Sequence, residues 1–596
     1  MTRRPFRIVR PRETREAPRL PMNAALLGRV WGLTRPYARR RNVLFVLTLL
    51  RALQLPLLAW SVGKILSGPI ARHDAKGTAW GVAGFAGLLL FTEIVFSARL
   101  RHALELGEDI VQDLRRQVHH HILSMPMSFF SRMPLGRLLS RATSDVETIR
   151  LGIQDAVFVG VVQLGSMLTA AALMLWQDPV LFGVVFVLVP VLWLLIRYFH
   201  GRLFEAHTAM HESFSRVTAT LAETVSGVRA IQGFGREKAA QDAFRELIHD
   251  HARFNLQVAE QNAVFGPLAE LNGQMFLALL VVVGGYRALT GHTDLGPLVH
   301  FFFLAGIFFN PIPVLATQYN QALAAMAGAE RVFRLLDTPR EWDDAADAKL
   351  LQVAAGRVEL RHVSFGYESH VPVLSDVSFV AEPGQTVAIV GQTGGGKSTI
   401  LALIAKLYLP TSGHVFVDDQ DLAGVTRESL RRQMGLVQQA NFLWTGTVLE
   451  NIRYGKPSAS DEEVIAAAEA LGVKDLIEAL PQGFATPVGE RGASLSLGQR
   501  QIVCFARAML ADPRILLLDE ATSAIDTITE ARIQAALRNL LRGRTSFVVA
   551  HRLSTVRHAD QVLVVARGQI VERGTFATLA ASHGVFSELA QPTLQT

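Results

Sequence analysis

A glycine-rich segment in the second half of the chain combines the residue types that bind phosphate. Residues 391–398 read Gly-Gln-Thr-Gly-Gly-Gly-Lys-Ser, after an apolar run at 387–390 and before a helix-forming run at 399–407. Glycines let backbone N–H groups surround phosphate oxygens at the start of a helix, the lysine reaches the β- and γ-phosphates, and the serine can bind Mg²⁺. The residues predicted to bind ATP here are Gly391, Gly394, Gly396, Lys397, Ser398 and Thr399.

Two acidic residues follow a second apolar run further along the chain. Residues 515–518 are Ile-Leu-Leu-Leu, and Asp519 and Glu520 come directly after them. Catalysis of phosphoryl transfer consists mostly of positioning and charge stabilisation, so Asp519 is suited to holding Mg²⁺ and Glu520 to polarising an attacking water. An Asp-Glu pair alone is weak evidence, but its position after the phosphate loop predicts ATP hydrolysis.

The segment between these two sites resembles a known family. Residues 495–501, Leu-Ser-Leu-Gly-Gln-Arg-Gln, are similar to the signature sequence of ABC transporters. The resemblance implies that Ser496, Gly498 and Gln499 contact ATP held by a second subunit, so that hydrolysis requires a pair of half-transporters. Leu497 occupies a position where the family usually has glycine. Because an altered signature often marks one subunit of an asymmetric pair in this family, a homodimer and a heterodimer both stay open.

Five further positions match the family in the expected order, and the resemblance implies their roles. Tyr367 would stack on adenine, Gln439 would sense the γ-phosphate and Mg²⁺, and His551 would hold the γ-phosphate. Glu490 would contact the coupling helices, and Asp526 would connect the two ATP sites of the dimer. The implied catalytic residues are Glu520 and His551, and the implied Mg²⁺ ligands are Ser398, Gln439 and Asp519.

The composition indicates that part of the chain lies in lipid. Of 596 residues, 50% are hydrophobic and 19% are charged, and the mean hydropathy is +0.26. A chain of this length exceeds one compact domain. Six apolar runs in the first half are each long enough to cross about 30 Å of hydrocarbon as a helix. They lie at 43–66, 80–98, 153–176, 179–196, 271–289 and 297–316.

The connections between these runs differ in length. Residues 177–178 and 291–296 are short and predict tight external turns, whereas 99–152 and 197–270 are long, charged and helix-forming and predict extensions into the cytoplasm. Because the number of spans is even, we expect both termini and the nucleotide-binding domain in the cytoplasm. Parts of the two long connections, at 129–147 and 223–237, resemble the coupling regions of B-type multidrug and lipid exporters.

The charge distribution agrees with this orientation. The net charge is +7, and twelve arginines within residues 1–41 precede the first apolar run. Basic residues beside a span stay in the cytoplasm, so the lipid bilayer rather than nucleic acid is the expected neighbour. No apolar core with a cleavage site precedes Asn42, so no signal peptide is expected, and the pattern favours a bacterial inner membrane. The single cysteine, Cys504, is expected to be buried.

We therefore expect a membrane α-helical domain, with six transmembrane helices and long cytoplasmic extensions, fused to an α/β ABC nucleotide-binding domain. Residues 1–41 form a basic cytoplasmic segment, 42–335 the transmembrane domain, 336–355 an acidic linker and 356–596 the nucleotide-binding domain. In the last domain, strand-like runs alternate with helical ones, which predicts a largely parallel sheet.

Some residues in the spans have both a functional and a structural interpretation. Glu93 lies in the second apolar run, where an acid is costly and indicates a substrate or proton site, unless it pairs with Arg51 or faces water. The segment Asn310-Pro-Ile-Pro predicts a kink in the sixth span. The phenylalanines at 301–303, 308 and 309 suit a substrate cavity or, alternatively, helix packing and lipid contact.

These features predict ATP-driven export of hydrophobic or amphipathic small molecules, of the multidrug type, by alternating access. A lipid flippase would use the same motifs, and an ATP-gated membrane regulator with little transport is a further alternative. Glu520 and His551 argue against a cassette that binds ATP without hydrolysing it. An importer is disfavoured because the spans and the cassette share one chain and no binding-protein module accompanies them.

Overall fold

The computed structural model describes residues 24–596, except for 293–294, 340–343, 346, 353–354, 369–370, 520–526, 551–552, 583 and 595–596. Most of the basic segment predicted at residues 1–41 therefore lies outside the described residues. The chain forms two compact units, one of residues 1–123 and 136–338 and one of residues 124–135 and 339–596. Each unit has its own packing.

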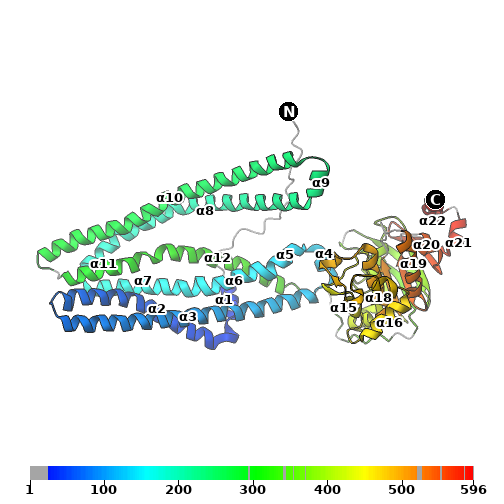
Figure 1. Cartoon of the computed structure of the whole chain (residues 1–596), viewed down its shortest axis with the longest axis horizontal. Coiled ribbons are helices and arrows are strands. Elements are labelled where there is room, and N and C mark those ends of the chain that lie inside the picture. Colours follow the sequence, from blue (N-terminus) through cyan, green and yellow to red (C-terminus); the bar gives the residue numbers. More distant parts are fainter. Residues whose placement is uncertain are drawn as a thin grey trace. The chain divides into compact units, whose positions relative to one another are not determined.

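The first unit is entirely helical in its described residues (Figure 1). Its long helices are α2 (Ala38–Ile65), α3 (Ala75–Ser124), α7 (Phe158–Gln177), α8 (Pro179–Ser226), α10 (Glu237–Leu289), α11 (Leu295–Phe309) and α12 (Pro311–Leu336). Its short helices are α1 (Ala24–Gly32), η1 (Arg35–Tyr37), η2 (Leu66–Ile70), α5 (Leu135–Ser140), η3 (Arg141–Asp145), α6 (Val146–Leu151), η4 (Gly152–Val157) and α9 (Val228–Gly233).

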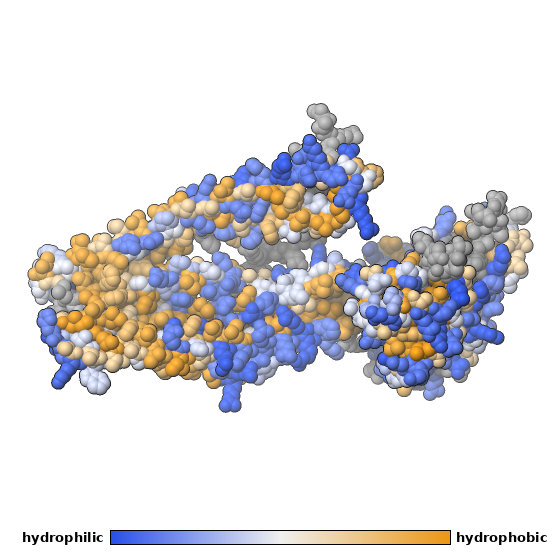
Figure 2. Space-filling view, in the orientation of Figure 1, coloured by the Kyte–Doolittle hydropathy of each residue, from blue (hydrophilic) through white to orange (hydrophobic). Residues whose placement is uncertain are grey.

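Six helical stretches of this unit are long and apolar enough to cross a membrane. They are Arg35–Ile70, Ala75–Ser124, Leu135–Gln177, Pro179–Ser226, Glu237–Leu289 and Gly296–Leu336. Hydrophobic residues gather on the surface around α7 and α11, and hydrophilic residues become more frequent toward α9 (Figure 2). The prediction of six spans with long polar extensions is confirmed.

The helices of the first unit pack in two groups. The hairpin partners α8 and α10 lie along each other, α2 lies along α7, and α11 packs against α2, α7 and α10. Phe301 and Phe308 of α11 are buried in a core with Phe276 of α10, whereas the Phe302 side chain is 53% exposed. The phenylalanines of the sixth span are thus divided between helix packing and the surface.

Two details of the spans bear on the sequence predictions. The sixth span is interrupted at Asn310, because α11 ends at Phe309 and α12 begins at Pro311. Glu93 is exposed, and no ion pair within the described residues joins it to Arg51. The Arg51 guanidinium instead donates to the carbonyl of Thr92 at 3.2 Å. The structure therefore shows no direct ion pair between Arg51 and Glu93, although the two side chains lie on neighbouring spans.

The second unit contains two main sheets. The larger has the order β12-β11-β3-β10-β9-β6 and is parallel except for β12. Its strands are β3 (Thr386–Val390), β6 (Met434–Val437), β9 (Ile515–Asp519), β10 (Thr545–Val549), β11 (Gln561–Ala566) and β12 (Gln569–Gly574). The smaller, antiparallel sheet has the order β2-β1-β4-β5, with β1 (Val358–Phe365), β2 (Leu374–Ala381), β4 (Ser412–Val417) and β5 (Gln420–Asp421). The predicted parallel sheet is confirmed.

Helices cover these sheets because the central strands are apolar on both faces. All five residues of β10 are buried, as are the first four of β9, which is typical of parallel strands packed between layers. The described helices of this unit are α4 (Met127–Arg132), α13 (Lys397–Ile404), α14 (Arg427–Gln433), α15 (Val448–Arg453), α16 (Asp461–Leu471), α17 (Lys474–Glu478), α18 (Leu497–Ala511), α19 (Thr527–Leu541), α20 (Leu553–Arg557), α21 (Phe576–Ala581) and α22 (Val585–Leu594). The cysteine Cys504 of α18 is buried, as expected, and burial raises the pKa of its thiol.

Candidate nucleotide site

The phosphate loop connects the end of β3 to the start of α13. Gly391 has φ +147°, and a Cβ built on it would lie 2.0 Å from the carbonyl oxygen of Val565. Gly396, which caps α13, has φ +102°, and its Cβ would lie 2.6 Å from the Leu374 side chain. Side chains other than hydrogen would strain the backbone and collide at both positions. These two glycines are therefore required for the tight path of the loop.

The lysine of the loop is buried against the loop backbone. Lys397 is 6% exposed, and its Nζ donates to the carbonyl oxygens of Gly391 at 2.9 Å and Gln392 at 2.8 Å. Burial lowers the pKa of Lys397, and the negative charge of Asp519 opposes that shift. The ammonium is thus held inside the loop, within the electrostatic reach of the carboxylate that ends β9.

Ser398 and Thr399 differ in their surroundings although they are neighbours. Ser398 is exposed on the first turn of α13, whereas Thr399 is 5% exposed. The Thr399 hydroxyl lies 3.1 Å from the hydroxyl of Tyr367. Ser398 therefore presents its hydroxyl at the helix N-terminus, and Thr399 joins the first turn of α13 to the residue predicted to stack on adenine.

Tyr367 is positioned by other aromatic rings. It follows β1 by two residues, and its ring packs edge-on against Phe365 at 5.0 Å and Tyr408 at 5.2 Å between centroids. The Tyr367 side chain nevertheless remains 40% exposed. Sequence reasoning missed Tyr408, because a contact between residues 41 positions apart has no local signal. The arrangement leaves Tyr367 fixed in direction and available for stacking.

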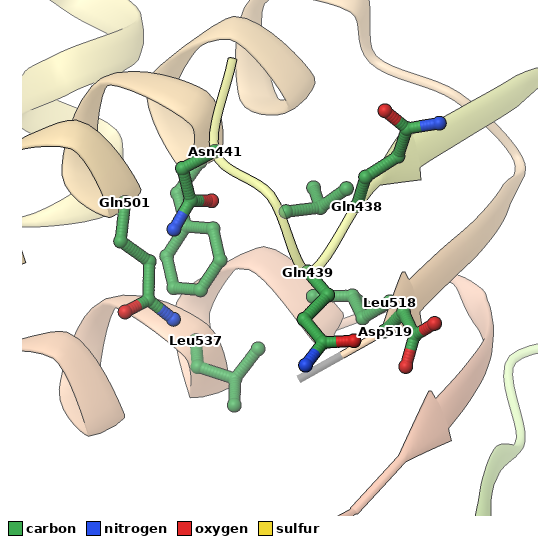
Figure 3. A pocket seen from close by; sticks show the side chains of 9 residues that line it. Gln438, Gln439, Asn441, Gln501, Leu518, Asp519 and Leu537 are labelled. Carbon is green, nitrogen blue, oxygen red and sulfur yellow. The ribbon is translucent and has the colours of Figure 1, made fainter. Parts of the chain in front are cut away.

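Gln439 and Asp519 line one pocket at the edge of the parallel sheet (Figure 3). Leu518 of β9 pairs with Val437, the last residue of β6, so the carboxyl ends of both strands reach the same edge. The side chains of Gln439 and Asp519 lie close together there, and Gln438 turns away from them. The remaining lining residues are Val437, Asn441, Gln501, Phe505, Leu518 and Leu537.

The oxygens gathered by this edge suit Mg²⁺. A hydroxyl, an amide and a carboxylate, from Ser398, Gln439 and Asp519, are hard ligands of the kind that Mg²⁺ binds together with phosphate oxygens. β10 lies between β3 and β9, with Val549 opposite both Ile389 and Asp519. The phosphate loop and Asp519 therefore share one edge of the sheet, as ATP binding would require.

The signature residues form the N-terminus of α18. Ser496 is the N-cap, and its Oγ accepts a hydrogen bond from the backbone N–H of Gln499 at 3.2 Å. The Gln499 Oε1 in turn accepts from the backbone N–H of Ser496 at 2.8 Å. This capping box uses the acceptors of both side chains, so the Ser496 O–H and the Gln499 amide N–H groups remain as donors. A helix N-terminus with such donors favours an anion.

Leu497 fits this helix end without strain. It is the first residue of α18 and is half-buried, and the neighbouring Gly498 is buried. A leucine adopts helical φ and ψ as readily as other residues, so the backbone at this position does not require glycine. The departure from the usual signature therefore changes the surface that Leu497 presents and leaves the fold of the helix intact.

Three of the predicted site residues, Glu520, Asp526 and His551, lie outside the described residues. Glu490 is exposed at the start of the short helix η7 (Glu490–Gly492). The structure thus brings together the phosphate loop, Tyr367, Gln439 and Asp519, and it places Ser496 and Gln499 at a separate helix end. The capping box was readable as Ser-x-x-Gln in the sequence, and sequence reasoning did not use it.

Comparisons with known proteins agree with this architecture. Residues 42–312 match the family model of the ABC transporter transmembrane region, and residues 374–523 match the family model described as ABC transporter. The ATP-dependent lipid A-core flippase of Syntrophus aciditrophicus is 33% identical over 570 residues, which cover 94% of each chain. The chain therefore belongs to the ABC transporter family, as a type IV exporter half-transporter with an ATPase coupled to transport.

Two further relatives extend the comparison. The fatty acid ABC transporter ATP-binding/permease protein of Mycobacterium tuberculosis is 39% identical over 478 residues, which cover 80% of this chain and 75% of that protein. The structure of a bacterial Atm1-family ABC exporter with ATP bound has a TM-score of 0.76 and 26% identity, and covers 93% of this chain and 98% of that one. The chain is a multi-pass membrane protein of a family whose half-transporters dimerise.

Proposed function

We propose that this chain, paired with a second half-transporter, exports hydrophobic or amphipathic molecules across a bacterial inner membrane by alternating access. The observation that carries the proposal is the shared sheet edge, where β3, β6 and β9 place the phosphate loop, Gln439 and Asp519. An ATP-hydrolysing cassette fused to six spans provides both the energy source and the path. ATP is the substrate that drives transport, and Mg²⁺ is the expected cofactor.

The chemistry assigned to the residues follows from their positions. Lys397 would exchange the carbonyl oxygens of Gly391 and Gln392 for the β- and γ-phosphate oxygens, because its burial favours any arrangement that pairs its charge. Ser398, Gln439 and Asp519 would hold Mg²⁺, which supplies charge neutralisation to the phosphates. Glu520 would polarise the attacking water, and His551 would hold the γ-phosphate. Tyr367 would stack on adenine.

The second subunit completes the site. Ser496 and Gln499 at the N-terminus of α18 would donate to the γ-phosphate of ATP held by the partner, with Gly498 allowing close approach and Asp526 connecting the two sites. Glu490 would contact the coupling helices. Each ATP would then be enclosed by two chains, so that hydrolysis releases the closed pair.

A lipid flippase is the second candidate function. The relative described as a lipid A-core flippase matches along nearly the whole chain, and one described as a fatty acid transporter has the higher identity. These names favour amphiphiles with acyl chains among the possible substrates. A flippase and an exporter of amphiphiles differ in the leaflet from which the substrate leaves and share the ATPase.

ATP hydrolysis by the chain purified alone in lipid nanodiscs, with particle mass recorded in the same sample, tests the proposal. Turnover by a two-copy particle that is lost in Glu520→Gln would establish a self-sufficient homodimer in which Leu497 is tolerated. An inactive particle that gains activity with a sister chain would establish a heterodimer. Hydrolysis without ATP-dependent movement of any amphiphile between leaflets or across vesicles would favour the membrane regulator and contradict transport.

A further inference from the structure

Three side chains form a cluster between the C-terminal end of α2 and the N-terminal half of α11. The rings of Trp60 and His300 are stacked, with centroids 6.0 Å apart and planes at 21°. The Nζ of Lys64 lies 5.4 Å from the centroid of the Trp60 ring. Trp60 and Lys64 are one helical turn apart on α2, so they share a face of that helix.

A glycine allows the two helices to meet at this cluster. A Cβ built on Gly63 would lie 2.2 Å from Cδ2 of His300. The His300 ring therefore rests on the backbone of α2, where it is only 7% exposed. Its Nε2 has no hydrogen-bond partner among the described residues. Because an unpaired buried nitrogen costs free energy, the packing of the ring against Trp60 must be what retains it there.

The helices that form the cluster carry no acidic side chain. The helices α2, α7 and α11, which pack together, and the adjoining η2 contain no aspartate or glutamate. Lys64 is exposed and makes no ion pair with a described residue. At the nearby start of α8, Asp178 already caps the helix and accepts from Arg287 at 3.3 Å. Lys64 is thus a cation beside an aromatic ring, and the helices that pack around it offer no carboxylate to pair with it.

We propose that Lys64 and Trp60 bind the anionic oxygen headgroup of a single-chain amphiphile, either a carboxylate or a phosphate. The ammonium of Lys64 donates to the headgroup oxygens, and the first methylene groups of the chain lie on the half-buried Trp60 ring. His300 acts as a positioning residue that fixes the plane of this ring. The inference rests on the proposed export of amphiphiles and narrows its substrate class to anionic ones.

Lysine and tryptophan also occur at membrane interfaces as simple anchors. An anchor needs only contact with headgroups, whereas Trp60 is stacked on a buried histidine that a glycine admits. Such a preorganised ring loses little conformational freedom when a ligand binds. This lowers the entropic cost of binding, as expected for a binding site. The exposed Lys64 ammonium favours an anionic headgroup, and no acidic residue of α2, α7 or α11 competes for it.

Photo-crosslinking of the full chain in phosphatidylcholine nanodiscs tests this site without requiring ATP hydrolysis. The probe is hexadecanoate with a diazirine beside its carboxylate, and the neutral control is hexadecanol with the diazirine at the same carbon. Labelled peptides are identified by mass spectrometry. We expect the carboxylate probe to label the peptides around Trp60 and His300, and labelling to fall roughly tenfold in Lys64→Gln, because a charged hydrogen bond is lost.

Matched variants separate binding from folding. Lys64→Arg keeps the charge and should retain labelling, and Lys76→Gln removes an exposed lysine from the start of α3 and should leave it unchanged. His300→Leu should reduce labelling, and His300→Phe, which keeps a stacked ring, should restore most of it. Competition by unlabelled hexadecanoate or hexadecyl phosphate then tells which headgroup binds more tightly.

Labelling that is equal for the alcohol and the carboxylate, or equal in the unchanged chain and Lys64→Gln, would overturn the proposal. Labelling confined to other helices would do the same. If a particle that never hydrolyses ATP still shows specific, Lys64-dependent labelling, the binding site is supported and only the proposed ATP-driven export is contradicted. The two proposals can therefore fail separately.

Discussion

Asn451 in the nucleotide-binding unit and Gln54 in the membrane unit are both amides, and each is 2% exposed. The Asn451 side chain bonds the backbone of Trp444 in both directions at 2.8 Å and the carbonyl of Thr447 at 3.0 Å, and it accepts from Arg507 at 3.1 Å. Neither amide atom of Gln54 has a hydrogen-bond partner among the described residues.

The difference separates two reasons for burying a polar group. Asn451 is fully paired, so it stabilises the loop that follows Gln439 and ties it to the signature helix through Arg507. Gln54, like Asn272 of α10, gains nothing from the described fold, and an unpaired buried amide costs about 1–3 kcal/mol. A polar residue retained at such a cost in a span points to transport rather than to stability.

The largest effect should come from Asn451→Leu. This change removes four hydrogen bonds and leaves the Trp444 amide and the Arg507 guanidinium without those partners, so we expect a loss of about 3 kcal/mol in unfolding free energy. Differential scanning calorimetry of the nucleotide-binding transition measures it. Asn539→Leu, which removes one bond to Leu471, is the control and should cost about 1 kcal/mol. Equal losses of unfolding free energy in the two variants would show that the hydrogen bonds of Asn451 contribute no more than the single bond of Asn539.

Gln54→Leu should raise the unfolding free energy, whereas Asn451→Leu lowers it. Leucine is similar in volume and removes the unpaired amide, so we expect a gain of about 1–2 kcal/mol in stability and a fall in transport. Thermal denaturation in the same detergent, followed by a vesicle transport assay, checks both. A loss of stability would show that Gln54 has a partner in the folded pair, and the contrast with Asn451 would then disappear.

Ser496→Ala tests the helix cap of the signature. Loss of the N-cap acceptor should cost about 1 kcal/mol and should lower ATPase activity by more than a cap alone explains, because the hydroxyl donor is lost too. Thr447→Ala, which removes an equivalent capping box from α15, is the matched control for stability. Equal ATPase rates in the two variants would remove Ser496 from the proposed site.

The smallest effect should come from an exposed ion pair. Arg29 donates two hydrogen bonds to Asp337, at 2.6 and 2.9 Å, and these bonds lower the pKa of that carboxyl. Because the folded pKa is the lower one, the stabilisation is present above the ordinary pKa of aspartate and is lost as the pH falls through the lowered value. With both side chains about half exposed, Asp337→Asn should cost roughly a few tenths of a kcal/mol. The cost should shrink in high salt and below pH 4 in thermal denaturation curves, and a cost independent of both would rule out the charge as its source.

The sequence predicted the parts of the molecule that depend on local patterns. The phosphate loop was recognisable because strand, glycines and helix are consecutive, and the six spans because lipid demands an apolar run of fixed length. The charged, helix-forming residues after the run at 80–98 likewise predicted that α3 continues beyond the apolar part, and it does so to Ser124. Hydropathy marks only the apolar part of such a helix, and the exact residue at which the helix ends, Ser124, was not predictable from it.

Contacts between distant residues were not predictable in this way. Tyr408 beside Tyr367, Arg507 beside Asn451 and His300 on Gly63 join residues from different elements, and their types are common. The interpretation of Glu93 as the partner of Arg51 was open for the same reason, since one-dimensional spacing does not say which faces of two helices meet. Glu520, Asp526 and His551 remain predictions from the sequence alone.

We expect the capping box at Ser496 to make closure of the proposed pair depend on a bound anion. With the Ser496 Oγ and the Gln499 Oε1 each accepting a bond inside the chain, the tip of α18 presents mainly N–H and O–H donors. A partner surface without an anion would leave these donors without acceptors. Each donor that loses its water in this way costs about 1–3 kcal/mol. In the proposed mechanism, the nucleotide would therefore hold together two surfaces that otherwise favour contact with water, and its hydrolysis would favour their separation.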